Sequence, residues 1–167
     1  MTTSEATEPQ HLVHVLKDFD SAFLITRTAA GDLRGRPMAL AEIEGDGDIY
    51  FATSLSHDVV REIEAEAHVA VTVQGKLKYA SVSGWARVVH DKALIQKLWR
   101  PGWKLWFPEG QEDPNLRLIA FEAGEGQYWD MSGTRGVKFA LRAAKAYLHG
   151  ERFEGRDSTE NAHVKLR

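Results

Sequence analysis

Hydrophobic residues recur along this chain with two periods, a helical one near the N-terminus and a strand-like one over most of the remainder. Thr7-Glu-Pro-Gln10 supplies an N-cap threonine, a first-turn proline and a capping-box glutamine, so a helix is predicted to begin there. Four apolar residues then follow at helical spacing: Leu12, Val15, Leu16 and Phe19. We expect this apolar face to lie on a sheet.

From residue 21 to about residue 89, short apolar stretches are separated by turn-forming segments such as AAGD and EGDGD. Another strand is predicted within LRLIAFEAGEGQYWD, where the glycines indicate an interruption of the pairing. Several short strands at hairpin spacing indicate a small antiparallel barrel or sandwich. The predicted fold class is therefore mainly β (α+β), with helices flanking the strands.

Three more helices are predicted. Ser56 and Asp91 are candidate N-caps for two short ones. A longer helix should run from about Thr134 to His149 and stop at Gly150. The residues expected on its buried side are Val137, Leu141, Ala144 and Leu148. A basic stripe on this helix is interpreted as a solvated face, with a phosphate-rich partner as the alternative: Arg135, Lys138, Arg142 and Lys145.

A length of 167 residues fits one domain, and 43% apolar residues suffice for a core. Residues 1–6 are expected to be a disordered N-terminal tail, residues 7–150 the folded domain with its C-terminal helix, and residues 151–167 a mobile C-terminal tail. The chain has no cysteine, which excludes disulfides, Cys-ligated metals and a cysteine nucleophile.

The charge and the segment pattern narrow the possible partners and location. A net charge of −3 and a pI near 6.2 give no basic field for nucleic acid. No export signal or membrane span is predicted, so we expect a cytoplasmic protein without a membrane partner. The fingerprints of Rossmann enzymes, P-loop NTPases and serine hydrolases are missing. His11 and His14 could share a metal, but no third ligand lies near them, and no metal site is predicted.

The first candidate functional segment is LRGRPMALAEI. In a strand, Arg34, Arg36 and Met38 would point to one side. A proline within a strand, here Pro37, indicates an edge or a bulge, where a ligand or partner can approach the backbone. Arginine suits phosphate or carboxylate recognition. A plain surface arginine beside a bulge is the equally supported alternative.

The second candidate is the strand-to-helix junction FATSLSHDVVREI. The free N–H groups of a helix N-terminus, together with the hydroxyls of Thr53, Ser54 and Ser56, could hold a phosphate. Asp58 would itself occupy that end of the helix, which fits an ordinary capped surface helix equally well.

The third candidate is LWRPGWKLWFPEG, where prolines and glycines prevent a long helix. Its aromatic residues could cover a planar heterocycle. The alternative is that they fill a core or form a subunit interface, which are the commoner roles of such residues.

Three fragments together resemble the general stress protein family of flavin-binding split barrels, which are relatives of pyridoxamine 5'-phosphate oxidase: ITRTAAGDLRGRPMA; IYFATSLSHDVVREIEAEAHVAVTV with YASVSGWARVV; and LWRPGWKLWFPEGQEDP with a closing YWD. The similarity covers roughly Leu12 to Asp130, and WKLWFPEG is its most specific part. It implies a split antiparallel β-barrel of the FMN-binding type, which forms a homodimer and binds FMN between the two subunits.

The resemblance also implies roles for individual residues. Arg36, Pro37 and Met38 would lie along the isoalloxazine and ribityl parts of FMN. Gln74 would face the polar edge of the ring. The phosphate would be surrounded by Thr53, Ser54, Ser56 and His57. The family's aromatic loop corresponds to Trp103, Lys104 and Trp106.

Two departures from the family pattern bear on function. Asp58 and Val59 stand where relatives commonly carry a basic residue, so the phosphate charge must be met by Arg36, Arg61, His57 or the other subunit. The C-terminus lacks the Arg-x-His pattern of the true oxidase, which disfavours a vitamin B6 substrate.

The leading hypothesis is a homodimeric FMN protein, a flavin-dependent oxidoreductase linked to stress response, with NAD(P)H as a possible electron donor. The cofactor supplies the redox chemistry, so no catalytic residue is assigned. The alternatives are a non-catalytic flavin carrier or sensor, and a barrel that binds another planar ligand, either a deazaflavin or a haem. For a haem, His57 and His68 are the first candidate axial ligands.

Overall fold

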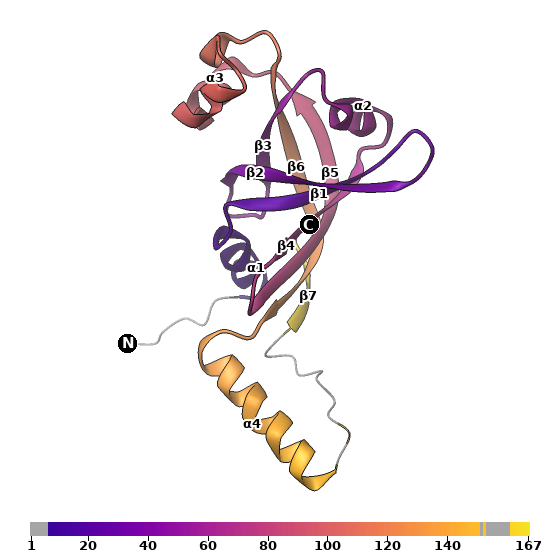
Figure 1. The fold of residues 1–167 in the computed structure, drawn as a ribbon, viewed down its shortest axis with the longest axis vertical. Coiled ribbons are helices and arrows are strands. Elements are labelled where there is room, and N and C mark those ends of the chain that lie inside the picture. Colours follow the sequence, from indigo (N-terminus) through magenta and orange to yellow (C-terminus); the bar gives the residue numbers. More distant parts are fainter. Residues whose placement is uncertain (1–6, 151, 153–160) are drawn as a thin grey trace.

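The computed structural model describes residues 7–150, 152 and 161–167, and its centre is an antiparallel β-barrel (Figure 1). The sheet order is β3-β2-β1-β4-β5-β6-β7, and β3 also pairs with β6, which closes the first six strands into a barrel. The strands are β1 (Ser21–Arg27), β2 (Leu33–Ile43), β3 (Ile49–Ser54), β4 (His68–Gln74), β5 (Lys78–Val89), β6 (Leu116–Asp130) and β7 (Asn161–Lys165). The predicted mainly β split barrel with flanking helices is thus confirmed.

The interior of the barrel is filled by the inward positions of these alternating strands. In β1, for example, Ala22, Leu24 and Thr26 are buried while their neighbours are more exposed. The largest fully buried side chains include Phe51, Phe121 and Tyr128. The side chains of each strand therefore divide into a mainly apolar set that faces the interior and an outer set that is available for contacts.

Helix α1 (Glu8–Lys17) begins as the sequence predicts, with Thr7 as the N-cap and its backbone N–H donating to Gln10 Oε1 at 2.9 Å. Its apolar face is buried against the barrel. His11 contacts the buried carboxylate of Asp130 at 2.9 Å, so this histidine already has a polar partner. No helix among the described residues has both the length and the apolar run needed to cross a bilayer.

Two short helices and two 3-10 turns lie near one end of the barrel, in the upper part of Figure 1: α2 (Asp58–Ala65), α3 (Lys92–Leu98), η1 (Pro101–Leu105) and η2 (Gly110–Glu112). Asp91 caps α3 as predicted, because its carboxylate accepts from the Leu94 N–H at 3.0 Å. The segment from α3 to η2 packs on a second hydrophobic cluster, made of Ala41, Ile95, Leu98, Trp103, Phe107, Leu116 and Leu118. This cluster holds the aromatic segment at the end of the barrel.

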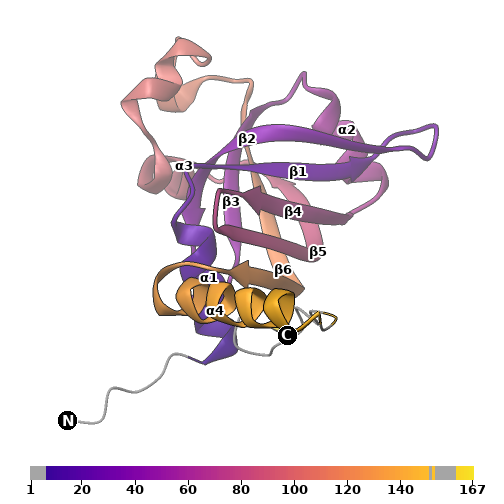
Figure 2. The same cartoon turned by 60° about the horizontal axis from the view of Figure 1, so that its bottom comes forward.

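The C-terminal part differs from the sequence-based expectation. Helix α4 (Gly133–His149) forms and stops at Gly150, whose φ of 66° is left-handed. Its predicted buried side is exposed, however, with Val137, Leu141 and Leu148 between 61% and 81% accessible. Figure 2 shows α4 outside the barrel. Apolar periodicity identifies one face of a helix but does not say what covers it.

Residues 161–167 are not a mobile tail, because β7 pairs with β6 along five residues. Val164 is buried, and Arg167 donates to the Asp48 carboxylate at 2.8 Å. The sequence pattern does not predict this strand, because its few apolar residues lie in a polar context. The disorder predicted for residues 1–6 and the mobility predicted for residues 151 and 153–160 concern positions outside the described residues.

Candidate functional site

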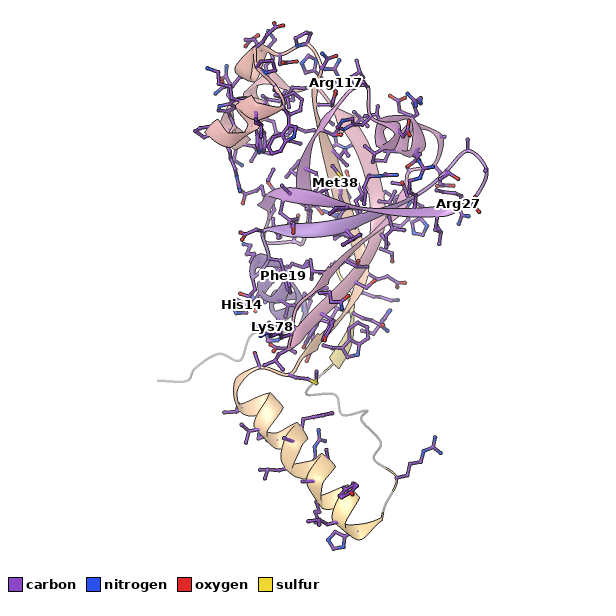
Figure 3. All side chains as sticks on the ribbon, in the orientation of Figure 1. His14, Phe19, Arg27, Met38, Lys78 and Arg117 are labelled. Carbon is purple, nitrogen blue, oxygen red and sulfur yellow. The ribbon has the colours of Figure 1, made fainter. Side chains whose placement is uncertain are left out.

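A cleft opens where β2 and β3 separate. Residues 33–39 of β2 pair with β1, whereas pairing of β2 with β3 starts at Leu40, opposite Phe51, and is irregular there. Around Pro37, β2 is thus an edge strand on its β3 side, as its proline predicts. Met38, labelled in Figure 3, lies on this part of β2.

The cleft has a volume of about 720 Å³, which falls within the range of ordinary small-molecule sites. One wall comes from β2, another from the end of β3 and the start of α2, and the third from the aromatic segment. The lining residues are Arg34, Arg36, Pro37, Met38, Ala39, Ala52, Thr53, Ser54, Ser56, His57, Asp58, Val59, Trp103, Trp106 and Phe107.

Hydroxyl groups gather at the turn between β3 and α2. Ser54 Oγ and Ser56 Oγ lie 3.0 Å apart, and Thr53 Oγ1 lies 3.3 Å from His57 Nδ1. The N-cap of α2 is His57 and not Ser56 as predicted, and the Ser56 hydroxyl contacts that of Ser54. The first turn of α2 therefore has no side-chain cap.

Glu62 is a buried carboxylate that organises the arginines of the cleft. It accepts from Arg36 Nη2 at 2.5 Å and from Arg34 Nη1 at 3.0 Å. Thr26 Oγ1 donates to the same carboxylate at 2.5 Å and accepts from Arg36 Nη1 at 2.8 Å. Arg36 is consequently held by two partners in one orientation, and its charge is already partly compensated.

A second acidic group, Asp58, lies at the rim of this network. It forms an ion pair with Arg61 on the same helix and contacts Arg34 at 3.5 Å.

Burial by itself raises the pKa of Glu62, but hydrogen bonds from Thr26 and Arg36 and the charges of Arg36 and Arg34 hold this pKa below its ordinary value. Glu62 is therefore ionised at neutral pH.

We expect Glu62→Gln to lower the melting temperature near neutral pH and to matter less in acid. Because the pKa of Glu62 is lower in the folded chain than its ordinary value of 4.5, ionised Glu62 stabilises the fold above about that pH. This contribution is lost as the pH falls through the folded-state pKa. Melting curves of both proteins from about pH 7 to about pH 3 test this. The control is Glu64→Gln, at an exposed site of the same helix. A constant difference between wild type and Glu62→Gln would contradict it.

The aromatic residues divide between two roles that the sequence left open. Trp103 and Phe107 are buried in the second hydrophobic cluster, and Trp103 meets Trp99 edge-on with ring centroids 5.7 Å apart. Trp106 also lines the cleft but is 68% exposed. The segment thus contributes a fixed apolar wall and one open indole ring.

The structure brings most of the predicted site residues together. Nine line the cleft: Arg36, Pro37, Met38, Thr53, Ser54, Ser56, His57, Trp103 and Trp106. Lys104 is exposed and does not line it, and Gln74 lies at the exposed end of β4. Within one chain, Gln74 is therefore apart from the others.

Glu62 was not predicted as the partner of Arg36, and Phe107, which belongs to the aromatic segment predicted as a possible cover for a planar ligand, was not assigned to the cofactor site. Phe107 follows Trp106 directly, so the aromatic cluster already signalled it. Glu62 had a weaker signal: it is the acidic residue on the apolar face of α2, beside the buried Val59 and Ile63. A buried acid of this kind needs a cationic partner.

Comparison with known proteins identifies the family. The sequence profile described as pyridoxamine 5'-phosphate oxidase like matches residues 7–154. The chain belongs to this family. A candidate general stress protein 26 from Jannaschia sp. CCS1 is 26% identical over 92% of this chain and 95% of that chain, with a TM-score of 0.71. The family resemblance seen in the sequence is therefore confirmed.

Two further relatives of this pyridoxamine 5'-phosphate oxidase-like chain are informative. The general stress FMN/FAD binding protein from Xanthomonas citri is 29% identical, with a TM-score of 0.65, over 75% of this chain and 89% of that one. Protein bli-3 from Neurospora crassa is 30% identical in an alignment of length 109 that covers 59% of this chain and 52% of that protein. The match thus spans about half the length of this curated relative.

Proposed function

We propose that this chain binds FMN in the cleft and acts as a flavin-dependent oxidoreductase linked to stress response. The observation that carries the proposal is the composition of the cleft. An aromatic wall and the hydroxyl-bearing start of a helix line the same cavity of about 720 Å³. A flavin mononucleotide has the matching parts, a planar apolar ring and a phosphate. The FMN/FAD binding relative from Xanthomonas citri supports the same ligand class.

The turn before α2 would hold the phosphate. The hydroxyls of Thr53, Ser54 and Ser56 and the free N–H groups of the first turn of α2 are donors of the required kind. Asp58 lies beside them, but its ion pair with Arg61 and its contact with Arg34 offset its charge. Half-exposed Arg34 is the cation most available to an incoming phosphate.

The flavin ring would lie between β2 and the aromatic segment. Pro37 and Met38 would contact it from β2, with Arg36 held at its edge by Glu62. Trp106 would cover the ring from the other wall, and Lys104 next to it could approach a bound donor. When bound, the flavin supplies hydride transfer, for which NAD(P)H is the proposed donor. The chain's own residues orient the ring and restrict water access.

A homodimer is part of this proposal, and the outer face of the barrel supports it. Two rows of outward residues cross four strands, Gly35-Ile25-Ala70-Ser83 and Pro37-Phe23-Thr72-Ser81, and neither contains a charge. Phe23 is 51% exposed in this face. An uncharged, partly apolar patch of this kind is typical of an interface.

The same outer face explains how Gln74 could reach a flavin. Pro37 belongs both to the face and to the cleft, so a second copy seated on the face would border the cleft. Gln74 lies on β4 two residues beyond Thr72, at the end of the face. In a two-fold symmetric dimer, Gln74 would lie at the cleft of the other copy, where it could contact the flavin.

Absorption spectroscopy tests the function directly. Purified protein is incubated with a slight excess of FMN and freed of unbound ligand by gel filtration. We expect flavin bands near one equivalent per chain, and bleaching when NADPH or NADH is added without air. Bound flavin that neither donor bleaches would support the carrier or sensor instead. A protein that retains no flavin would overturn the FMN site and return the deazaflavin and haem alternatives to consideration.

A further inference from the structure

Helix α4 stands away from the barrel, although the described segments on either side of it, β6 and β7, both belong to the barrel sheet. It follows Asp130, whose carboxylate accepts from the N–H and the hydroxyl of Ser132. Beyond the helix the chain returns as β7, which pairs with β6. Figures 1 and 2 both show the body of α4 outside the barrel. Its 17 residues extend about 25 Å.

The exposed side of α4 is strongly apolar. Val137, Leu141 and Leu148 recur at helical spacing and are 61%, 66% and 81% accessible. Tyr147 is 87% accessible. Large apolar side chains gathered on one exposed helix face mark a contact surface, because water would otherwise cover them at a cost in free energy.

The charge of α4 is opposite to that of the remaining chain. Four basic residues and no acidic residue lie among its 17 residues. Since the whole chain has a net charge of −3 and α4 contributes +4, the remainder carries −7. An apolar surface bordered by carboxylates elsewhere on this protein would therefore complement α4 in both respects.

Such a surface exists around Trp85 on the outside of β5. Trp85 is 56% exposed and pairs across strands with Glu122. Two more glutamates lie near Trp85. The Glu66 carboxylate accepts from the backbone N–H of His68, whose ring contacts Trp85, and Glu125 lies three residues beyond Glu122 on β6. Arg87 and His163 reach Glu122 and Glu125 only at 3.5 and 3.8 Å, near the limit for an ion pair. The indole is thus an apolar site bordered by three glutamates.

The α4 of the same chain does not cover this surface. From Glu122 to Asp130, where the chain leaves the sheet, β6 runs about 25 Å. From there α4 extends away from the barrel (Figure 1). The occupant that has both the apolar stripe and the basic residues is therefore α4 of a second copy.

We propose that α4 is an intersubunit arm, whose Val137, Leu141 and Leu148 pack on the Trp85 surface of a second copy of this chain. Lys138 and Lys145 beside the apolar stripe meet the glutamates around Trp85. Two-fold symmetry makes the exchange reciprocal, so each copy gives and receives one arm. This inference rests on the homodimer in the proposed function. Trp85 follows Ser83 on the outer side of β5, so the arm contact continues the uncharged outer face.

Cysteine cross-linking tests the arm, because the chain contains no cysteine of its own. Leu141→Cys and Glu122→Cys are made in separate chains, mixed, and oxidised. We expect a covalent dimer that contains one chain of each kind. The control mixture replaces Glu122→Cys with Lys97→Cys on exposed α3. If a disulfide between two Leu141→Cys chains forms faster than the mixed disulfide, α4 contacts α4 of the second copy and the proposal is overturned. Equal yields of the mixed disulfide in the two mixtures would also overturn it.

Sedimentation supplies a second readout. Leu141→Asp with Leu148→Asp should raise the dissociation constant of the dimer by about tenfold or more. Leu105→Asp, at a leucine that is 78% exposed on η1, should leave it unchanged. A dimer unaffected by the paired change would overturn the arm. So would α4-dependent flotation of the wild type with phosphatidylglycerol vesicles, which would assign α4 to lipid. Flavin uptake is measured separately, so failure of the arm and failure of the flavin site give different results.

Discussion

Replacing Gly84 with alanine is expected to destabilise the barrel by about 3 kcal/mol or more. An added Cβ at Gly84 would lie 2.0 Å from the backbone oxygen of Glu122 and 3.0 Å from Phe121 Cζ. A backbone oxygen in a paired strand cannot move aside as a flexible side chain can. The expected decrease in melting temperature is at least about 6 °C for a domain of this size, measured by calorimetry.

Gly45→Ala is the matched control for Gly84→Ala. Nothing lies within 4 Å of the Cβ that this change would add at Gly45. The control should melt within about 1 °C of wild type, since surface changes away from special features have small effects. Equal melting temperatures for the two variants would contradict the close approach of β5 to β6 at Gly84.

The second large effect is expected from Arg36→Ala, which should weaken FMN binding by about ten- to a hundredfold. That range corresponds to the loss of one hydrogen bond from a charged group. Arg36 lines the cleft and is oriented by Glu62 and Thr26, so little side-chain entropy is lost when a ligand binds. Fluorescence titration of FMN measures the change, because flavin emission responds to binding.

A double variant separates binding from folding at this pair. Arg36→Ala alone leaves the Glu62 carboxylate with Arg34 and Thr26, so some of its effect could come through stability. Arg36→Ala with Glu62→Ala removes both charges. We expect the double variant to melt closer to wild type and still to bind FMN weakly. Recovery of wild-type affinity would show that Arg36 only neutralises Glu62.

Much of the cleft was predictable because it depends on local signals. Alternation in β2 put Arg36 and Met38 on one side, and Pro37 marked the part of the strand that lacks a β3 partner. The hydroxyls before α2 and the aromatic cluster are likewise contiguous in sequence. Residues within one segment keep their relation in any fold that preserves the secondary structure.

The parts that could not be predicted depend on contacts between distant segments. Arg36 and Glu62 are 26 residues apart, and no local pattern joins them. The face of α4 was expected to be buried because its periodicity resembles that of a core helix, yet periodicity gives a direction and not a partner. Strand β7 was not predicted for the same reason, because it forms by pairing with β6, which is distant in the sequence.

The pairing of β7 with β6 also has an evolutionary consequence. Trp129 and Asn161 are opposite each other in the sheet, with Cα atoms about 5 Å apart, so the chain leaves and re-enters the barrel at nearly one point. Helix α4 can therefore lengthen, shorten or change sequence without altering the register of any barrel strand. Mutations at the exposed positions of α4 escape the constraints that packing imposes on the core. Selection could thus adjust how copies of this chain associate while the residues of the cleft stay the same.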